Sequence, residues 1–314
     1  MSDRSLVIGS RGSQLALWQA NHIRAQLAER GVECSIQIIK TTGDRITDVP
    51  LAVAGLQSGS GKGLFTKEIE EALLAGRIDL AVHSLKDLPT ELPEGLTLAA
   101  IPERESPLDA LVGSRFEDLP RGARVGTSSL RRAAQLRRRR PDLDVVSLRG
   151  NVDTRLRKLE EGQCDAIVLA AAGLLRLGWG ERITELLQPE LMCPAVGQGA
   201  LAVETRQTGA GFEICGALDH AATRAAVTAE RALLGTLGGG CQVPVGAHAV
   251  IDGARMHLSA VVISPDGVDI ASGALESEVS RPEAAGHELG QQLLAQGAAA
   301  ILKRVYPSPR DRAV

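Results

Sequence analysis

The chain has 314 residues, of which 44% are hydrophobic but only 2% aromatic, and its formal net charge is −3. This length suffices for two or three domains with a large aliphatic core, while the small net charge excludes a protein that binds a polyanion over its whole surface. Five cysteines without a CxxC pair argue against a disulfide framework or a zinc site. We expect a cytoplasmic protein, because the sequence has neither a signal-peptide core nor a membrane-length apolar run.

Short apolar runs alternate with helical patterns in the first half of the chain. Strands are predicted at residues 5–9, 33–40 and 80–82, and helices at about 14–30 and 65–75. Residues 99–109 contain two prolines and mixed charge, as in a crossing into a second domain. The alternation then restarts, with strands at 123–126, 144–148 and 165–170 that each lead into a helix. This order predicts mainly parallel sheets with helices on their faces.

The pattern changes after residues 194–207, which look like a return crossing with a strand at 200–204. A helix is expected at 221–234. Strands at 245–251, 256–263 and 268–276 are separated by Asp-Gly turns, which are hairpin signals, so we expect an antiparallel sheet here. Residues 281–305 are predicted to close the chain as one helix.

The strand at 80–82 ends abruptly in polar residues. Ser84, Lys86 and Asp87 follow it and place a hydroxyl, an ammonium and a carboxylate at one sheet edge. In open α/β sheets, ligands bind outside the carboxyl ends of the strands. The alternative is a solvated turn that merely ends a strand.

Positive charge is concentrated between residues 121 and 158. This segment contains 12 basic and three acidic side chains, a net charge of 12 − 3 = +9. A basic patch of this kind suits nucleic acid or a small polycarboxylate or phosphate, and Arg137 to Arg140 alone suit a solvated helix face. Several polar side chains fall at strand-to-helix turns, where backbone N–H groups and the helix dipole favour anions. They are Arg11, Arg131, Arg132, Arg149, Arg155, Ser13, Thr127, Ser128 and Ser129. Such turns from two domains predict one cleft for a ligand with many carboxylates, and the scarcity of aromatics disfavours single-stranded nucleic acid.

Cys241 follows three glycines, which allow the loop to approach another group closely and keep the thiol accessible. A lone cysteine is usually buried and inert. Of the cysteines, only this one is placed for covalent chemistry, as a nucleophile or an attachment point.

These motifs together resemble the porphobilinogen deaminase, or hydroxymethylbilane synthase, family. The resemblance runs from Leu6 to about Val250 and rests on six segments in this order. They are GSRGSQLALWQ (9–19), KGLF (62–65), HSLKDLP (83–89), VGTSSLRR (125–132), LRGNVDTR (148–155) and GGC (239–241). The segment before Lys62 is longer than expected for the family, in a loop that the family uses as a mobile lid.

The resemblance implies an enzyme of tetrapyrrole and heme biosynthesis, a transferase. It would join four porphobilinogen molecules head to tail, with loss of ammonia at each step, to give hydroxymethylbilane on a covalent dipyrromethane cofactor. It implies that Asp87 is catalytic and that Cys241 carries the cofactor through a thioether. Further cofactor contacts are implied for Lys86, Ser84, Ser129, Arg131, Arg132, Arg155, Thr127 and Gly150. Substrate contacts are implied for Arg11, Ser13, Arg149, Arg176, Phe65, Lys62 and Gln198, and no metal is implied.

The family resemblance also implies three domains, the first two similar to periplasmic binding proteins and the third a small antiparallel α+β domain. The boundaries expected here are 1–103 with 198–217, then 104–197, then 218–314. We expect a monomer whose partner is the small-molecule substrate, with no nucleic acid and no membrane. Two rival interpretations stay open. One is a non-catalytic solute sensor on the same two-lobed fold, which needs neither Asp87 nor Cys241, and the other is a nucleic-acid binder that uses residues 121–158.

Overall fold

The computed structural model describes residues 5–42, 66–238 and 243–305. The chain divides into two compact units, Met1–Glu105 with Gly199–Arg224, and Ser106–Gln198 with Ala225–Val314. Each unit is described by itself below, and the division into three domains stays a prediction. Within the described residues, no helix has the length and apolar character that crossing a membrane requires.

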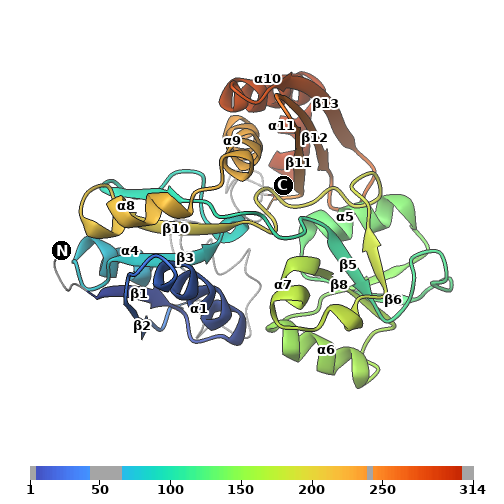
Figure 1. The fold of residues 1–314 in the computed structure, drawn as a ribbon. Coiled ribbons are helices and arrows are strands. Elements are labelled where there is room, and N and C mark those ends of the chain that lie inside the picture. The colour runs from blue at the N-terminus through green and yellow to red at the C-terminus, as the bar shows by residue number, and fades with distance from the viewer. Residues whose placement is uncertain (1–4, 43–65, 239–242, 306–314) are drawn as a thin grey trace, which may run out of the picture. The chain divides into compact units, whose positions relative to one another are not determined.

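The first unit is built on a five-stranded sheet with the order β2-β1-β3-β10-β4 (Figure 1). Strands β2, β1, β3 and β4 run in one direction and β10 runs against them, so the sheet is mainly parallel, as predicted. The strands are β1 (Leu6–Ser10), β2 (Cys34–Ile38), β3 (Leu80–Ser84), β4 (Leu96–Ala100) and β10 (Leu201–Arg206).

Helices cover both faces of this sheet. Helix α1 (Gln14–Ala28) places Ala20, Ile23 and Leu27 against one face, and α4 (Lys67–Leu74) packs on the other. The three buried α1 residues recur at intervals of three and four, which is why this segment forms a one-sided helix. Full burial of Ile23 or Leu27 contributes roughly 1.5–3 kcal/mol each. The unit also contains η1 (Leu85–Asp87), α8 (Ala210–Cys215) and η3 (Gly216–Leu218).

The second unit contains a sheet with the matching order β7-β6-β8-β5-β9. Strand β5 is the one that runs against the other four. Helix α5 covers one face of this sheet, and α6 and α7 cover the other. The elements are β5 (Asp109–Val112), β6 (Arg124–Gly126), α5 (Leu130–Arg139), β7 (Asp144–Val146), α6 (Val152–Glu160), β8 (Ala166–Ala170), α7 (Ala171–Arg176), η2 (Gly180–Arg182) and β9 (Glu185–Leu187).

A second sheet in this unit has three antiparallel strands in the order β11-β12-β13, as the hairpin signals predicted. Its core is filled by side chains from α9, α10 and α11. The elements are α9 (Ala221–Thr236), which begins in the first unit, β11 (Val245–Asp252), β12 (Arg255–Ile263), β13 (Ile270–Glu278), α10 (Pro282–Ala295) and α11 (Ala298–Val305).

The single closing helix predicted at 281–305 is wrong, because the segment forms two helices. Gly297 lies between them with φ +96°, a left-handed conformation that only glycine adopts readily. The amide of Gly297 donates to the carbonyl of Leu294, which ends the first helix. Prediction by periodicity alone overlooked this break, because the apolar spacing continues through it.

Candidate active site

In the first unit, two polar turns meet at one edge of the sheet. Strands β1 and β3 are parallel neighbours, with Ile8 paired to Leu80, so their carboxyl ends lie side by side. One turn carries Arg11 and Ser13 and the other carries the sequence-predicted residues Ser84, Lys86 and Asp87. Ser13 caps helix α1, because its hydroxyl accepts a hydrogen bond from the Ala16 amide at 3.3 Å. The first unit alone therefore brings five of the predicted site residues to one sheet edge.

The turn that carries Asp87 is fixed at its beginning. Gln19, which is buried on α1, donates from Nε2 to the hydroxyl of Ser84 at 2.8 Å. The chain then forms the short 3₁₀ turn η1, in which Leu85 is buried, Lys86 is half-buried and Asp87 is exposed. The buried Leu85 anchors this turn, so the Asp87 carboxylate is held at the surface of the sheet edge. Sequence reasoning missed Gln19, which an amide on the otherwise buried face of a helix could have signalled.

A buried ionisable cluster lies on the face of the same sheet that helix α4 covers. The Nε2 of His83 is 2.9 Å from Oε2 of Glu204, and both side chains are buried. The two atoms are close, but their orientation makes no well-formed hydrogen bond, so the contact is an ion pair only when the imidazole is protonated. Burial raises the pKa of nearby Glu70, and the charge of Glu204 raises it further, while the neighbouring hydroxyl of Thr66 lowers it. The cluster therefore favours a protonated Glu70.

In the second unit, the turns after the parallel strands β6, β7 and β8 meet at the carboxyl edge of the sheet. The turn after β6 is tied to the one after β7, because the amide of Thr127 donates to the carbonyl of Val146 at 2.9 Å. The hydroxyl of Ser128 also donates to the Leu148 carbonyl at 2.7 Å. Ser129 caps α5 through its hydroxyl, which accepts from the amide of Arg132. Hydroxyls and the amino end of a helix thus share one edge, as predicted.

The turn after β7 carries Arg149 and Gly150. Gly150 has φ +115°, and a Cβ atom there would lie 2.6 Å from Cγ2 of Thr154, so only glycine fits. Its carbonyl accepts from Nε of Arg155 at 2.8 Å, and the carbonyl of Arg149 accepts from Nζ of Lys158 at 3.1 Å. These two bonds use cations of α6 to hold the backbone of the turn.

Arg131 and Arg132 are buried, which the sequence did not indicate. Both bind the fully buried carboxylate of Asp109, the first residue of β5, at 2.7 Å each. Burial opposes ionisation of Asp109, but the two guanidinium groups overcome it and hold the pKa of this carboxyl well below its usual range. Asp109 was missed because it lies outside the window 121–158 in which charges were counted. An aspartate at the head of an apolar run was the available signal.

Two further predicted residues are also buried in the second unit. Gln198 donates from Nε2 to the carbonyl of Pro107 at 2.7 Å and to Oδ1 of Asp109 at 2.9 Å. Arg176 lies in the last turn of α7. Gln198 thus belongs to the network around Asp109.

The arginine run at the end of α5 binds the protein itself. Arg137 donates to the carbonyl of Pro265 at 2.8 Å, and Arg138 donates to the carbonyls of Gly267 and Val268. Arg139 donates to the Glu190 carbonyl. Arg140 forms two 2.8 Å bonds with Asp142, and their hydrogen bonding lowers the pKa of that carboxyl to about 2. This run therefore fastens α5 to its neighbours, which is more than the solvated face that the sequence suggested.

Four of the five cysteines lie in the described residues as free thiols. Burial raises the pKa of each of them, and for Cys193 and Cys215 it raises the pKa to about 12. Such thiols are poor nucleophiles at neutral pH. Lys62, Phe65 and Cys241 lie outside the described residues. Among the described residues, no group of three or more His, Cys, Asp or Glu side chains is arranged to hold a metal ion.

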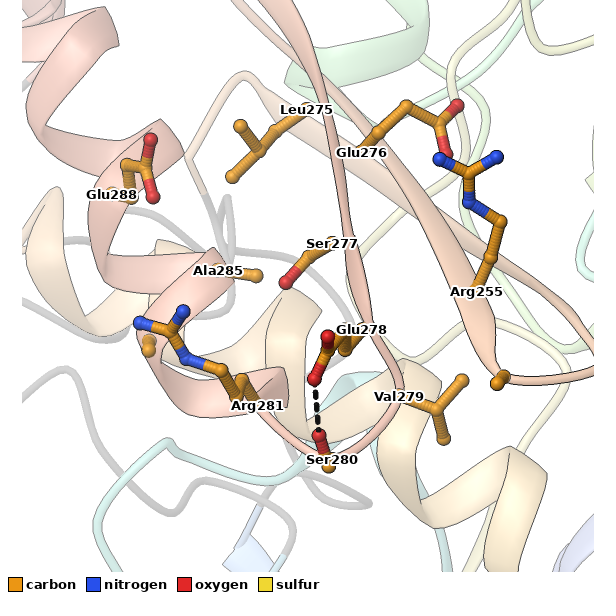
Figure 2. A pocket seen from close by; sticks show the side chains of 12 residues that line it. Arg255, Leu275, Glu276, Ser277, Glu278, Val279, Ser280, Arg281, Ala285 and Glu288 are labelled. Atoms are coloured by element: carbon orange, nitrogen blue, oxygen red, sulfur yellow. Dashed lines mark hydrogen bonds between the residues drawn. The ribbon is translucent and has the colours of Figure 1, made fainter.

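A cavity of about 620 Å³ lies between β13 and α10 (Figure 2). Figure 2 shows acidic side chains on both sides of it, with Glu278 on the strand and Glu288 on the helix, and Ser280 bonded to Glu278 at 3.1 Å. Its charged lining contains three glutamates and two arginines, and none of the predicted site residues lines it. Its net negative lining is unsuited to a polycarboxylate, so we place the chemistry at the two sheet edges instead.

Each unit by itself presents hydroxyl and cationic side chains at the carboxyl edge of a mainly parallel sheet. This arrangement defines a class of α/β proteins that bind small ligands bearing several carboxylates. Residues 6–213 match the family model "Porphobilinogen deaminase, dipyromethane cofactor binding domain", and residues 224–295 match "Porphobilinogen deaminase, C-terminal domain". The chain belongs to the porphobilinogen deaminase family.

Curated relatives agree over nearly the full length. The porphobilinogen deaminase of Pelobacter propionicus is 52% identical over 311 residues, covering 98% of this chain and 99% of the relative. That of Nitratidesulfovibrio vulgaris is 53% identical over 313 residues, covering 97% and 98%. A TRAP periplasmic solute binding protein from Desulfovibrio salexigens aligns over 97% of this chain and 81% of its own, but at 9% identity and a TM-score of 0.39. The two family models and the curated relatives confirm the enzyme class and the dipyrromethane cofactor predicted from the sequence.

Proposed function

We propose that this chain joins four porphobilinogen molecules head to tail and releases ammonia at each step, with Asp87 as the catalytic carboxylate. The observation that carries the proposal is the placement of Asp87. It is an exposed carboxylate on an anchored turn, next to Lys86 and at the same sheet edge as Arg11. The family membership supports the reaction, and this placement supports the choice of Asp87 as its carboxylate.

The chemistry at each step explains why one carboxylate suffices. The C–N bond of the substrate's protonated aminomethyl group breaks, and its electron pair leaves with ammonia. The remaining methylene carbon is cationic and conjugated to the pyrrole N–H. Asp87 accepts a hydrogen bond from that N–H and stabilises the positive charge. A C–C bond then forms to the free α-carbon of the growing chain, and that carbon loses a proton.

The side chains at the two sheet edges suit the anionic rings. Each pyrrole ring carries two carboxylates, so the growing chain becomes more anionic with every unit added. We assign Arg11, Ser13, Arg149 and Arg176 to the carboxylates of the substrate. Guanidinium groups bind carboxylates in two-point fashion, and α5 and α6 add the positive ends of their dipoles. Lys62, Phe65 and Gln198 complete the proposed substrate contacts.

The described residues fit a polycarboxylate cofactor. Asp109 pairs with both Arg131 and Arg132, and among the described residues Nε of Arg131 is buried without a hydrogen-bond partner. When bound, the dipyrromethane supplies the first free α-carbon. We assign its carboxylates to the cofactor group predicted from the sequence, Lys86, Ser84, Thr127, Ser129, Gly150, Arg131, Arg132 and Arg155. We assign the thioether to Cys241, because burial raises the pKa of each of the other four thiols.

We further propose that the protein works in the cytoplasm as a monomer, without nucleic acid, and that it has the three domains expected from the sequence. The arginines from 137 to 140 are engaged with backbone carbonyls and Asp142, which weakens the nucleic-acid alternative. Size-exclusion chromatography of the purified chain, with and without a duplex oligonucleotide, tests the monomeric state and the absence of nucleic-acid binding.

The experiment that tests the activity is incubation of the purified chain with porphobilinogen. We expect one ammonia released per porphobilinogen consumed, and one linear tetrapyrrole formed per four. A solute sensor would bind porphobilinogen without consuming it. Binding without ammonia release would therefore contradict the proposal and favour that alternative.

A further inference from the structure

We propose that Asp109 is the positioning residue for the arginine pair, setting the directions in which Arg131 and Arg132 present their guanidinium groups. This inference rests on the proposed function, in which the two arginines bind carboxylates of the cofactor. It assigns a role to an acidic residue inside a site that otherwise selects anions.

The geometry makes Asp109 the common partner of both arginines. Oδ2 lies 2.7 Å from Nη1 of Arg131, and Oδ1 lies 2.7 Å from Nη2 and 2.9 Å from Nε of Arg132. The pair makes further bonds to uncharged acceptors, from Arg131 to the Cys193 carbonyl at 2.6 Å and from Arg132 to the Val168 carbonyl at 3.0 Å and Oε1 of Gln198 at 3.4 Å. Asp109 is thus the carboxylate that both arginines share, and it is fully buried.

The carboxylate is itself held in place. Asp109 is the first residue of β5 and is paired there with Ala170 on one side and Leu187 on the other. The side-chain amide of Gln198 donates both to Oδ1 of Asp109 and to the Pro107 carbonyl. A sheet position and an amide thus fix the carboxylate, and the carboxylate in turn fixes two flexible side chains.

The hydrogen bonding of Arg131 leaves one buried donor for a ligand. Asp109 is shared by two guanidinium groups, and within the part of the chain that the structure describes Nε of Arg131 is a buried donor without a hydrogen-bond partner. Leaving a buried donor unpaired is costly. Asp109 therefore compensates enough charge to allow two adjacent arginines to be buried, while Nε of Arg131 stays available to an incoming carboxylate.

Stability alone is a poor reason for such a cluster. Replacing a buried ion pair or triad by well-packed apolar residues is often neutral or stabilising. What the ionic cluster adds is fixed direction, because a guanidinium held on one side can present its other edge without further loss of rotamer freedom. A site that must bind several carboxylates in register benefits from that pre-organisation.

The test compares Asp109→Asn with Asp142→Asn, both purified from cells as the wild-type chain is. The control removes an equivalent carboxylate from an Arg–Asp pair at the other end of the same helix. For Asp109→Asn we expect a folded chain that mostly lacks the two-pyrrole mass and turns over porphobilinogen with kcat/KM lowered roughly 10²-fold. We expect Asp142→Asn to match wild type in both.

A crystal structure of Asp109→Asn gives a readout that does not depend on turnover. We expect at least one of the two guanidinium groups to have left residue 109 and changed rotamer. Wild-type positions of both arginines, or wild-type cofactor content and kcat/KM, would overturn the proposal.

If Asp109→Asn does not fold, the double variant Asp109→Asn with Gln198→Glu provides the second test. It returns a carboxylate to the cluster from a neighbouring position, within reach of Arg132, and so restores the charge count. We expect it to fold and to remain depleted of cofactor, because Arg131 still lacks its anchor. Full cofactor content in the double variant would show that charge compensation alone suffices and would overturn the positioning role.

The failure of this inference is distinguishable from failure of the proposed function. If the wild-type chain neither carries the two-pyrrole mass nor consumes porphobilinogen, the function fails, while the crystal structure of Asp109→Asn still decides whether Asp109 orients the arginines. If wild type is active and Asp109→Asn is unchanged, only the positioning role fails.

Discussion

The side-chain amide of Gln19 is bonded to the hydroxyl of Ser84 at 2.8 Å, across the interface between helix α1 and the end of strand β3. Gln19 is buried, so water competes little for this bond. Ser84 begins the turn that presents Asp87, and the same helix begins at the turn that carries Arg11 and Ser13. The helix that follows the first polar turn is therefore bonded directly to the start of the second.

Replacing Asp87 with asparagine is expected to lower kcat about 10²- to 10³-fold while much of the chain keeps its cofactor. Asparagine keeps the size of the side chain but cannot balance the positive charge that develops when ammonia leaves. Ammonia release under saturating porphobilinogen measures the effect, and Asp118→Asn, an exposed aspartate of the second unit, is the control. Near-normal turnover of Asp87→Asn would remove Asp87 from its role.

Replacing Arg149 with alanine is expected to stall cofactor assembly or chain elongation, because the turn after β7 loses its guanidinium. Intact mass after brief incubation with porphobilinogen should show intermediates that accumulate. The control is Arg157→Ala, because Arg157 is exposed on α6 and its contact with Glu161 is 3.7 Å long. Intermediates that run through to product as fast as in wild type would contradict an anion-binding role at Arg149.

Gly150→Ala is expected to destabilise the chain by about 1–3 kcal/mol, because φ +115° suits glycine and the new Cβ would lie 2.6 Å from Cγ2 of Thr154. Denaturant unfolding measures the loss. Gly162→Ala is the control for backbone strain alone, since Gly162 has φ +72° but open space around it. Adding Thr154→Ser to Gly150→Ala should recover part of the difference. Equal losses for the two alanine variants would show that the contact with Thr154 contributes nothing.

Glu70→Gln is expected to stabilise the chain progressively as pH rises above about 4.5, the ordinary range for glutamate. Burial raises the pKa of Glu70 in the folded state, so the protonated form is favoured there. The stability that this group contributes is complete below its unfolded pKa and is lost as pH rises toward the folded pKa. Thermal unfolding from pH 4 to 8 measures this, with exposed Glu71→Gln as control. A constant difference between wild type and Glu70→Gln across that range would contradict it.

The sequence predicted the strand-to-helix turns well because each feature there is local. An apolar run that ends in Thr127 to Ser129, or in Ser84 to Asp87, identifies both a strand end and the polar atoms beyond it. The signal for the hairpins of the β11-β12-β13 sheet is equally local, because Asp-Gly turns separate the strands.

The features that could not be predicted are long-range. Strands β5 and β10 run against their sheets, and each is the first strand after the chain changes unit, a feature that no local pattern encodes. The burial of Arg131 and Arg132 depends on Asp109, which lies 22 and 23 residues earlier in the chain. The bond from Gln19 to Ser84 spans 65 residues. Side-chain pairing across such separations follows from the fold and is invisible to periodicity.

The most direct test of the central claim is the intact mass of the purified chain compared with that of Cys241→Ser. The account predicts that the wild-type chain exceeds its sequence mass by two pyrrole units, and that the variant shows the sequence mass alone. A wild-type chain at its sequence mass, or an adduct that persists in Cys241→Ser, would contradict it.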